Sequence, residues 1–273
     1  MVEWLIEPLT YGFIARGLVA AILTGVACAV LSAFVVWRGM SFVGDAIAHA
    51  ILPGIVLAYI TGTSLFFGAL GMAILIAAGI GWLSRSGQMK EDTAIGVIFT
   101  GFFALGILML SRVTSYQDLT HILFGNILGV SASDLTIMAV VMGIVLAVVF
   151  IFYKELLVTS FDPSHAIAIG LSPELVRYGL LLLIALTVVS AIQVVGVVLV
   201  LALLITPAAA ASQLARHLPA IIGLSVLFAV ISSLVGFYAS YYFNVASGAA
   251  VVLSLTVIFL ISFGVNAIKR TSS

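Results

Sequence analysis

The chain has 273 residues, of which 64% are hydrophobic and only 7% are charged. Soluble domains carry about 25% charged residues, so this composition excludes a soluble globular protein and indicates an integral membrane protein. Ten basic and ten acidic residues balance to a formal net charge of zero, which gives no indication of a nucleic-acid partner. The single cysteine, Cys28, excludes internal disulfides and a cysteine-cluster metal site.

The apolar stretches predict nine membrane crossings. About 20 apolar residues are needed for a helix to cross the hydrocarbon core. In chain order, the predicted crossings cover residues 18–36, 42–60, 64–83, 94–111, 135–152, 175–192, 195–213, 219–241 and 247–268. The expected fold is therefore all-α, a polytopic integral membrane protein in which residues 1–273 form a single transmembrane domain.

Two places leave the number of crossings at eight or nine. Residues 50–83 run for 34 residues without a charge. They form either two spans separated by a turn at Gly62 and Thr63 or one long tilted helix. The two-span interpretation requires a start near Phe42. Further along, Pro207 is followed by four alanines and is able to end a helix within the membrane.

Lysines and arginines predict the orientation of the spans. With nine crossings, eight basic residues fall on one side, against Arg16 and Arg112 on the other. Because positive loops face the cytoplasm, the C-terminus is predicted inside and the N-terminus outside. Joining the second and third crossings leaves a bias of similar strength, so charge alone does not count the helices. The eight residues on the cytoplasmic side are Arg38, Arg85, Lys90, Lys154, Arg177, Arg216, Lys269 and Arg270.

Two loops are longer than a bare connection requires. The outer loop, residues 112–134, is expected to form a short helix packed on the bundle. In the inner loop, residues 154–174, the sequence predicts a short cytoplasmic helix with Asp162 as its N-cap, Pro163 at its first position and Gly170 at its C-terminal stop. Such a helix suits docking to a soluble partner, and an amphipathic helix lying in the membrane interface is the alternative.

Several catalytic motifs are absent from the chain. There is no G-x-x-x-x-G-K-[ST] loop for nucleotide phosphates, no H-E-x-x-H and no G-x-S-x-G. Ser164 and His165 are adjacent in a loop, which is not a triad-like arrangement. The chain is therefore not expected to be an enzyme, and any ATP hydrolysis would take place on another protein.

Asp45 and His49 are the strongest indication of function. On a helix, residues four apart lie about 40° apart around the axis and roughly 6 Å along it, so the carboxylate and the imidazole converge. An ionisable residue within a span costs about 2.5–3.5 kcal/mol, so it tends to face a partner, the bundle interior or a water-filled path. The pair is therefore predicted to bind a divalent metal ion.

The flanks of this pair favour function over packing. Pro53 and Gly54 interrupt the helix one turn beyond His49, and broken helices are where transporters place their substrates. Small residues allow close approach of neighbouring helices or of a second copy. The alternatives are an Asp–His contact that only holds helices together, or a pair at the inner headgroup level, two to three turns from Arg38. The small residues form two i,i+4 stripes, Ala46, Ala50 and Gly54 in one and Gly44 and Ala48 in the other.

These residues belong to a longer familiar stretch. Residues 37–54, WRGMSFVGDAIAHAILPG, closely resemble the signature of the permease subunits of manganese, zinc and iron ABC importers, the ABC-3 family. The resemblance extends along nearly the whole chain. Further matching motifs, in family order, are 123–128 (LFGNIL), 161–163 (FDP) with Ala168 and Gly170, 195–200 (VGVVLV) and 204–209 (LITPAA).

The resemblance implies a homodimeric transmembrane pore, two cytoplasmic ATPase subunits and an extracytoplasmic binding protein that delivers the metal. It maps Asp45 and His49 onto the metal-interacting pair of the pore. It also maps residues 161–171 onto the coupling helix that holds the ATPase. The residues of this sequence that carry the coupling motif are Phe161, Asp162, Pro163, Ala168 and Gly170.

The expected function is that of a metal permease in a bacterial-type cytoplasmic (inner) membrane. Carboxylate and imidazole ligands without thiolates suit Mn²⁺, Zn²⁺ or Fe²⁺, with Mn²⁺ favoured as the transported ion and no permanently bound cofactor. The alternative is a self-contained ion-coupled carrier or channel that uses the pair as a proton relay, and a membrane enzyme is a more distant one. Gln193, Thr206 and Asn244 are expected to serve packing rather than the path.

Overall fold

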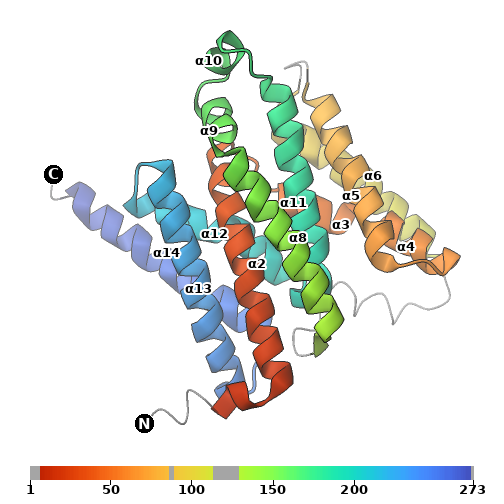
Figure 1. The fold of residues 1–273 in the computed structure, drawn as a ribbon, viewed down its shortest axis with the longest axis vertical. Helices are drawn as coiled ribbons and strands as arrows, with labels where there is room; N and C mark the ends of the chain where they lie inside the picture. The colour runs from red at the N-terminus through yellow and green to blue at the C-terminus, as the bar shows by residue number, and fades with distance from the viewer. Residues whose placement is uncertain (1–6, 86–88, 113–128, 272–273) are drawn as a thin grey trace. The chain divides into compact units, whose positions relative to one another are not determined.

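A computed structural model describes residues 7–85, 89–112 and 129–271, and none of these residues lies in a β-strand. Nine segments of this described part are long and apolar enough to cross a membrane, so the predicted all-α polytopic fold is confirmed. The helices (Figure 1) are η1 (Glu7–Thr10), α2 (Gly12–Trp37), α3 (Val43–Ala50), α4 (Leu52–Thr61), α5 (Leu65–Leu83), α6 (Glu91–Leu110), α8 (Ala132–Ile151), α9 (Tyr153–Phe161), α10 (Pro163–Ala168), α11 (Pro173–Val195), α12 (Val197–Leu214), α13 (Leu218–Phe243) and α14 (Ser247–Thr271).

Most of the outer loop cannot be compared with its prediction. Residues 113–128 lie outside the described part of the chain, and they include His121 and the 123–128 motif. The described end of this loop begins α8, where the Ser131 hydroxyl and the Asp134 carboxylate exchange hydrogen bonds with each other's backbone N–H groups. This reciprocal cap satisfies two of the N–H groups that a helix start leaves free.

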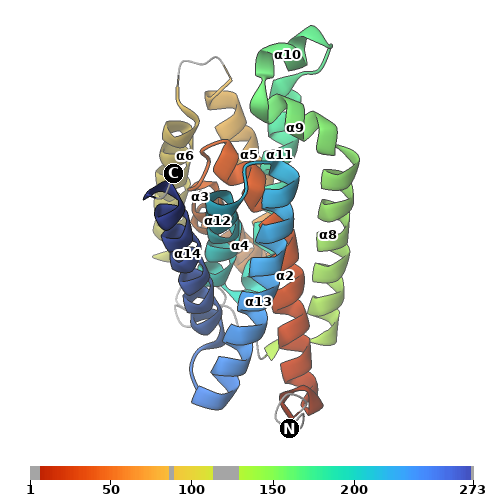
Figure 2. The ribbon, with the colours of Figure 1, turned by 90° about the vertical axis from the view of Figure 1, so that its left-hand side faces the viewer.

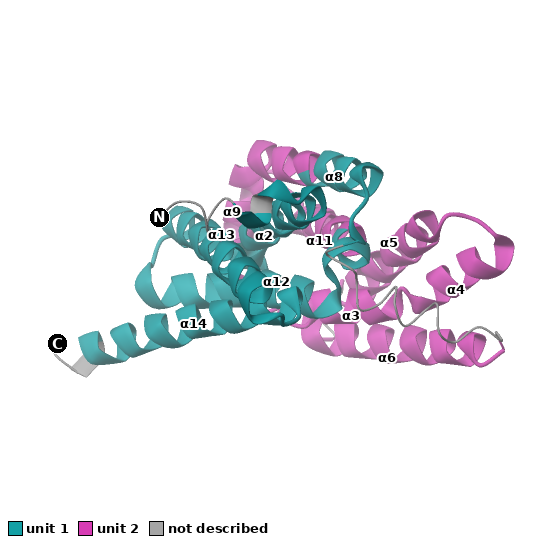
Figure 3. Ribbon diagram, turned by 90° about the horizontal axis from the view of Figure 1, so that it is seen from below, with its two compact units in different colours: residues 1–36, 121–142, 191–273 teal, residues 37–120, 143–190 magenta. Residues whose placement is uncertain are grey.

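The chain divides into two compact units, shown in different colours in Figure 3. Unit 1 comprises residues 1–36, 121–142 and 191–273, and unit 2 comprises residues 37–120 and 143–190. Each unit is assembled from segments distant in the sequence. The single transmembrane domain over residues 1–273 stays a prediction.

Unit 1 is held together by small residues at helix crossings. A Cβ placed at Gly25 of α2 would lie 3.3 Å from the Ser233 hydroxyl of α13, and one placed at Gly236 of α13 would overlap the backbone of Val251 in α14. In lipid, no hydrophobic effect drives helices together. Van der Waals packing at such close crossings stabilises their association instead. Cys28 is fully buried here, as expected for a core thiol.

Helix α12 continues through Pro207, so the interpretation of this proline as a helix end is wrong. Proline has no backbone N–H to donate, and its ring clashes with the carbonyl group four residues earlier in the helix. In unit 1 the next N–H group, that of Ala208, donates to the Ser32 hydroxyl of α2 at 3.2 Å. The helix break lies instead at Gly196, whose φ of +83° separates α11 from α12.

In unit 2, the uncharged stretch 50–83 forms two helices, so the single tilted helix is excluded. Gly62 has a left-handed conformation (φ 66°, ψ 21°) and ends α4, as its N–H donates to the Tyr59 carbonyl. Ser64 is extended before α5 begins at Leu65. The turn predicted at Gly62 and Thr63 is therefore confirmed. A φ near +60° is a conformation that glycine adopts most readily, which explains the glycine at the end of α4.

The predicted interruption beyond His49 is also present. Helix α3 ends at Ala50 and α4 starts at Leu52, with Ile51 between them and Pro53 in the first turn of α4. Proline provides no N–H for the His49 carbonyl four residues earlier, which weakens the helix at this point. The two short helices together are one candidate span, Val43–Thr61.

Two glycines allow α4 and α5 to touch through their backbones. A Cβ at Gly54 would overlap the carbonyl of Gly68 on α5, and a Cβ at Gly68 would overlap the carbonyl of Gly54. The stripe of small residues expected to accept a neighbouring helix therefore receives α5 of the same chain at Gly54. This crossing supports the helix pair that follows the candidate metal residues.

Gly54→Ala is expected to lower the stability of the protein clearly. The added methyl group meets backbone atoms, so the helices must separate, and overpacking of this kind costs typically about 1–3 kcal/mol. The measurement is the thermal unfolding midpoint of the detergent-purified protein. Gly71→Ala in α5 is the matched control, because a Cβ there meets nothing within 4 Å; equal midpoints for the two variants would contradict the proposed close crossing.

Candidate metal site

Helix α3 presents Asp45 and His49 on one side. Every other residue of this helix is buried, whereas the side chains of His49 and Asp45 are 33% and 37% exposed. Their i,i+4 spacing brings His49 Nε2 to 3.4 Å from Asp45 Oδ1. The predicted convergence of a carboxylate and an imidazole is therefore present in unit 2.

Two aromatic rings of α6 border the histidine. The Phe103 ring meets the His49 imidazole edge to face at a centroid distance of 5.5 Å, and the Phe99 ring lies at 6.2 Å. The two phenylalanines stack on each other at 5.7 Å with an interplanar angle of 18°. Edge-to-face contacts of this kind fix ring orientation, so α6 helps to orient the imidazole.

The sequence analysis missed this aromatic wall. Phe99 and Phe103 are spaced i,i+4 on a predicted span, so they lie on one helix face, but nothing in the sequence indicated that this face meets His49. Packing of α6 against both α3 and α4 creates the contact. The only relevant feature of the sequence was the i,i+4 spacing of the two phenylalanines.

The described residues of one chain offer only two candidate metal ligands at this place. Among the described residues no group of three His, Cys, Asp or Glu side chains is close enough to hold a metal ion. Zn²⁺ in protein sites takes four ligands, and Mn²⁺ prefers octahedral oxygen and nitrogen sets. Partial exposure of both side chains leaves room for further ligands.

Helix α10 forms the short element predicted in the inner loop. The Asp162 carboxylate accepts a hydrogen bond from the His165 N–H at 2.9 Å, and Pro163 occupies the first helical turn. After the helix, Gly170 has a φ of +84°, a value that favours glycine. The backbone N–H of Leu171 then donates to the Ala166 carbonyl at 2.9 Å, which closes the turn.

The helix is shorter than the predicted 161–171 element. It covers Pro163–Ala168, and Phe161 is the last residue of α9. Large apolar side chains at this end of unit 2 remain exposed: 48% for Phe161, 65% for Ile167 and 54% for Ile169. Exposed apolar side chains beyond the spans are a feature of protein contacts. In Figures 1 and 2, α9 and α10 lie at the same end of unit 2 as the start of α11.

Charged residues tie α11 to α5 at this end. Arg177 donates hydrogen bonds to the carbonyls of Gly81 and Ser84 at 2.8 and 3.2 Å. These carbonyls belong to the last turn of α5, where a cation is favourable to the helix dipole. Arg85 pairs with Glu174 at 3.1 Å. Two of the basic residues predicted on the cytoplasmic side therefore lie together in the structure.

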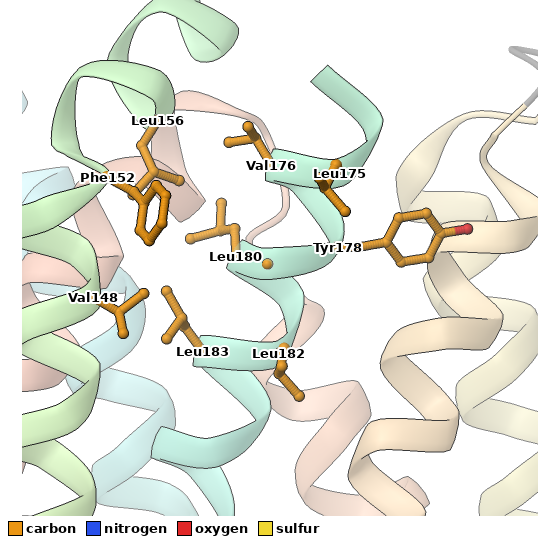
Figure 4. Close-up of a pocket in the computed structure, with 10 residues that line it drawn as sticks. Val148, Phe152, Leu156, Leu175, Val176, Tyr178, Leu180, Leu182 and Leu183 are labelled. Atoms are coloured by element: carbon orange, nitrogen blue, oxygen red, sulfur yellow. The ribbon is translucent and has the colours of Figure 1, made fainter. Parts of the chain in front are cut away.

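A separate cavity of about 420 Å³ in unit 2 has an almost entirely apolar lining. Its lining residues come from α8, α9 and α11, and include Leu156 and Leu183. Phe152, which lies between α8 and α9, also lines it. Figure 4 shows the Tyr178 hydroxyl pointing away from the side chains of Val148 and Leu183. The cavity offers no ligand for a cation.

Three further polar residues were expected to serve packing. Asn244 has a left-handed conformation (φ 53°) and ends α13, which is a structural role. Thr206 is half-buried in α12, and Gln193 is exposed on α11. Packing within this chain therefore does not explain why a glutamine occupies position 193.

The fold defines the class as a multi-pass membrane protein, and comparison with known proteins identifies the family. The model of the family described as "ABC 3 transport family" matches residues 10–266, so the chain belongs to this family. Members of the family are transport permeases rather than enzymes, and ATP is hydrolysed by a separate subunit.

Individual relatives match nearly the full length of the chain. The "Manganese transport system membrane protein MntC" of Listeria innocua is 47% identical over 253 residues, covering 93% of this chain and 90% of the relative. A "Probable iron transport system membrane protein" of Haemophilus influenzae is 42% identical, covering 98% and 99%. The solved structure "PsaBC from Streptococcus pneumoniae in complex with Fab" has a TM-score of 0.83 at 41% identity, covering 96% of this chain and 95% of that one.

Proposed function

We propose that the chain is the permease subunit of an ATP-driven importer for divalent transition metal ions, with Mn²⁺ as the favoured substrate and Fe²⁺ and Zn²⁺ as alternatives. Relatives named for manganese and for iron transport support this range. The observation that carries the proposal is the Asp45–His49 pair, which α3 leaves partly exposed while burying all its other residues.

Asp45 and His49 serve in this proposal as ligands of the transported ion. The carboxylate provides the larger electrostatic attraction, and the imidazole provides the ligand that selects for transition metals over Mg²⁺ and Ca²⁺. A small number of protein ligands, together with water molecules that stay on the ion, binds the ion weakly enough for it to leave again, which transport requires. The rings of Phe99 and Phe103 keep the imidazole oriented toward the ion.

A second copy of the chain completes the site. Two copies facing a shared axis contribute two carboxylates and two imidazoles, which makes four ligands of the kind that Mn²⁺, Fe²⁺ and Zn²⁺ accept. The incomplete set in one copy supports this arrangement, as does the prevalence of two-fold symmetry among oligomers. The homodimer forms one transmembrane pore.

The α9–α10 turn is the proposed docking site for a cytoplasmic ATPase subunit. The residues that hold the turn are Asp162 and Gly170, and Phe161 beside it offers an exposed ring. Movement of the ATPase subunits would reach the bundle through this turn and switch it between outward and inward access by rigid-body motion. An extracytoplasmic binding protein delivers the ion, and the complex resides in a bacterial-type cytoplasmic membrane.

The decisive test is reconstitution of the permease in liposomes with its ATPase and binding protein. Uptake of Mn²⁺ into the vesicles is expected to require ATP, the ATPase subunit and loaded binding protein together. Elemental analysis of vesicles offered Mn²⁺, Fe²⁺ and Zn²⁺ at equal concentration selects the substrate. Uptake that persists without the ATPase subunit would contradict the proposal and favour an ion-coupled carrier.

A further inference from the structure

Arg38 occupies the loop between α2 and α3, seven residues before Asp45. The loop is firmly held in unit 2: Gly39 has a φ of +71°, and Met40 is fully buried. The Met40 carbonyl accepts a hydrogen bond from the Val43 N–H at 3.0 Å, at the first residue of α3. A displacement of Arg38 is therefore passed to α3 through a short connection with little freedom.

The guanidinium of Arg38 holds the last turn of α9. Its Nε donates to the Ser160 hydroxyl at 3.0 Å, and its Nη2 donates to the Thr159 hydroxyl at 2.8 Å. Both hydroxyls in turn donate to backbone carbonyls of α9, Thr159 to Glu155 and Ser160 to Leu156. The acceptors are therefore oriented by their own helix, and the planar arginine fork matches the two of them at once.

An aromatic contact lies beside these hydrogen bonds. The Trp37 and Phe161 rings have a centroid distance of 4.5 Å. Phe161 directly precedes Asp162, which caps α10. Trp37, the last residue of α2, and Arg38, the next residue, thus contact three consecutive residues at the end of α9, immediately before the proposed docking helix.

The Arg38 guanidinium lies in partly buried and charged surroundings. Burial lowers the pKa of the Arg38 guanidinium, while nearby Glu91 raises it and Arg177 lowers it. A cation partly removed from water depends on its hydrogen-bond partners. The guanidinium is therefore expected to follow Thr159 and Ser160 when α9 moves rather than to exchange them for solvent.

We propose that Arg38 is a positioning residue that links the docking helix to the metal pair. Movement of α10 displaces the end of α9, the bonds from Thr159 and Ser160 displace Arg38, and the held loop displaces α3 with Asp45 and His49. This inference rests on the proposed function, because it assumes that α10 receives the ATPase and that the pair binds the transported ion.

The test measures Mn²⁺ taken up per ATP hydrolysed by the full transporter in liposomes. Arg38→Met is expected to lower this ratio by at least about tenfold while the ATPase rate stays within about twofold. Arg38→Lys, which keeps the charge and one donor, is expected to recover part of the ratio. Thr159→Val with Ser160→Ala should reproduce the loss from the other side, and adding Arg38→Met to it should cause no further loss.

The controls separate this link from folding and from the proposed function. Arg85→Gln removes an exposed basic side chain at the same end of unit 2 and is expected to leave the ratio unchanged. Mn²⁺ affinity of the purified permease should be unaltered in Arg38→Met. An unchanged ratio in Arg38→Met and in the Thr159/Ser160 variant would overturn the inference alone. Wild-type vesicles without ATP-driven uptake would overturn the proposed function and this inference with it.

Discussion

Asp45→Asn is expected to abolish Mn²⁺ uptake by the reconstituted transporter and to weaken Mn²⁺ binding by roughly 100-fold or more, since losing even an outer-shell partner costs about 10–100-fold. The substitution keeps the size of the side chain but removes the charge that attracts the cation. In a dimer it replaces two charged carboxylate ligands of the four proposed ligands by neutral amides at once. The measurements are Mn²⁺ binding by the purified permease and uptake by vesicles with ATPase and binding protein.

His49→Gln should give a similar loss of uptake, with a different effect on selectivity. Removal of the imidazole leaves oxygen ligands only, which suit Mg²⁺, Ca²⁺ and Mn²⁺ better than Fe²⁺ and Zn²⁺, so discrimination against Mg²⁺ and Ca²⁺ is expected to fall. The matched control is Glu174→Gln, an exposed carboxylate in a surface ion pair with Arg85, whose loss is expected to change little. Normal uptake by both Asp45→Asn and His49→Gln, at normal amounts of protein in the membrane, would show that the pair does not bind the ion.

Gly170→Val is expected to prevent stable association with the ATPase subunit while the spans still fold. The φ of +84° at this position is costly for a β-branched residue, on the order of 1–3 kcal/mol. The backbone must therefore change, and the turn closed by the bond from Leu171 N–H to the Ala166 carbonyl opens. Co-purification of the ATPase and ATP-driven uptake are both expected to fall by at least about tenfold.

The conservative partner of this variant is Gly170→Asn. Asparagine adopts a positive φ more readily than other non-glycine residues, so part of the association and uptake should return. Gly143→Ala in α8 provides a second control, because a Cβ there meets nothing within 4 Å. Association that is unchanged in Gly170→Val would mean that the ATPase docks elsewhere.

The local features of the candidate site followed from short stretches of sequence. Asp45 and His49 converge because the helix repeat places i and i+4 on one face, whatever packs around them. Asp162, Pro163 and Gly170 define α10 because a cap, a fixed φ and a positive φ act within a few residues. The range 161–171 that the family resemblance implied is longer than α10, since Phe161 belongs to α9.

Contacts between residues far apart in the sequence could not be predicted from short stretches of sequence. Pro207 was expected as a candidate helix end, but Ser32 accepts the neighbouring N–H and α12 continues. The aromatic rings beside His49 come from α6, and nothing local to either helix specifies which faces meet. Arg38 was counted only as a positive charge for orientation, while its hydrogen bonds connect residues more than 120 positions apart.

The sequence by itself determined that this protein has eight or nine helices able to cross a membrane, that one of them breaks beyond an acid–histidine pair, and that a capped helix lies in the loop between the fifth and sixth of them. Those properties depend on hydropathy, helix periodicity and backbone preferences, which act over neighbouring residues. Only the tertiary structure decided which side chains border His49 and which residues hold Arg38. Such contacts depend on the packing of distant helix faces, where many apolar surfaces are nearly equivalent in lipid and the small residues at the crossings select among them.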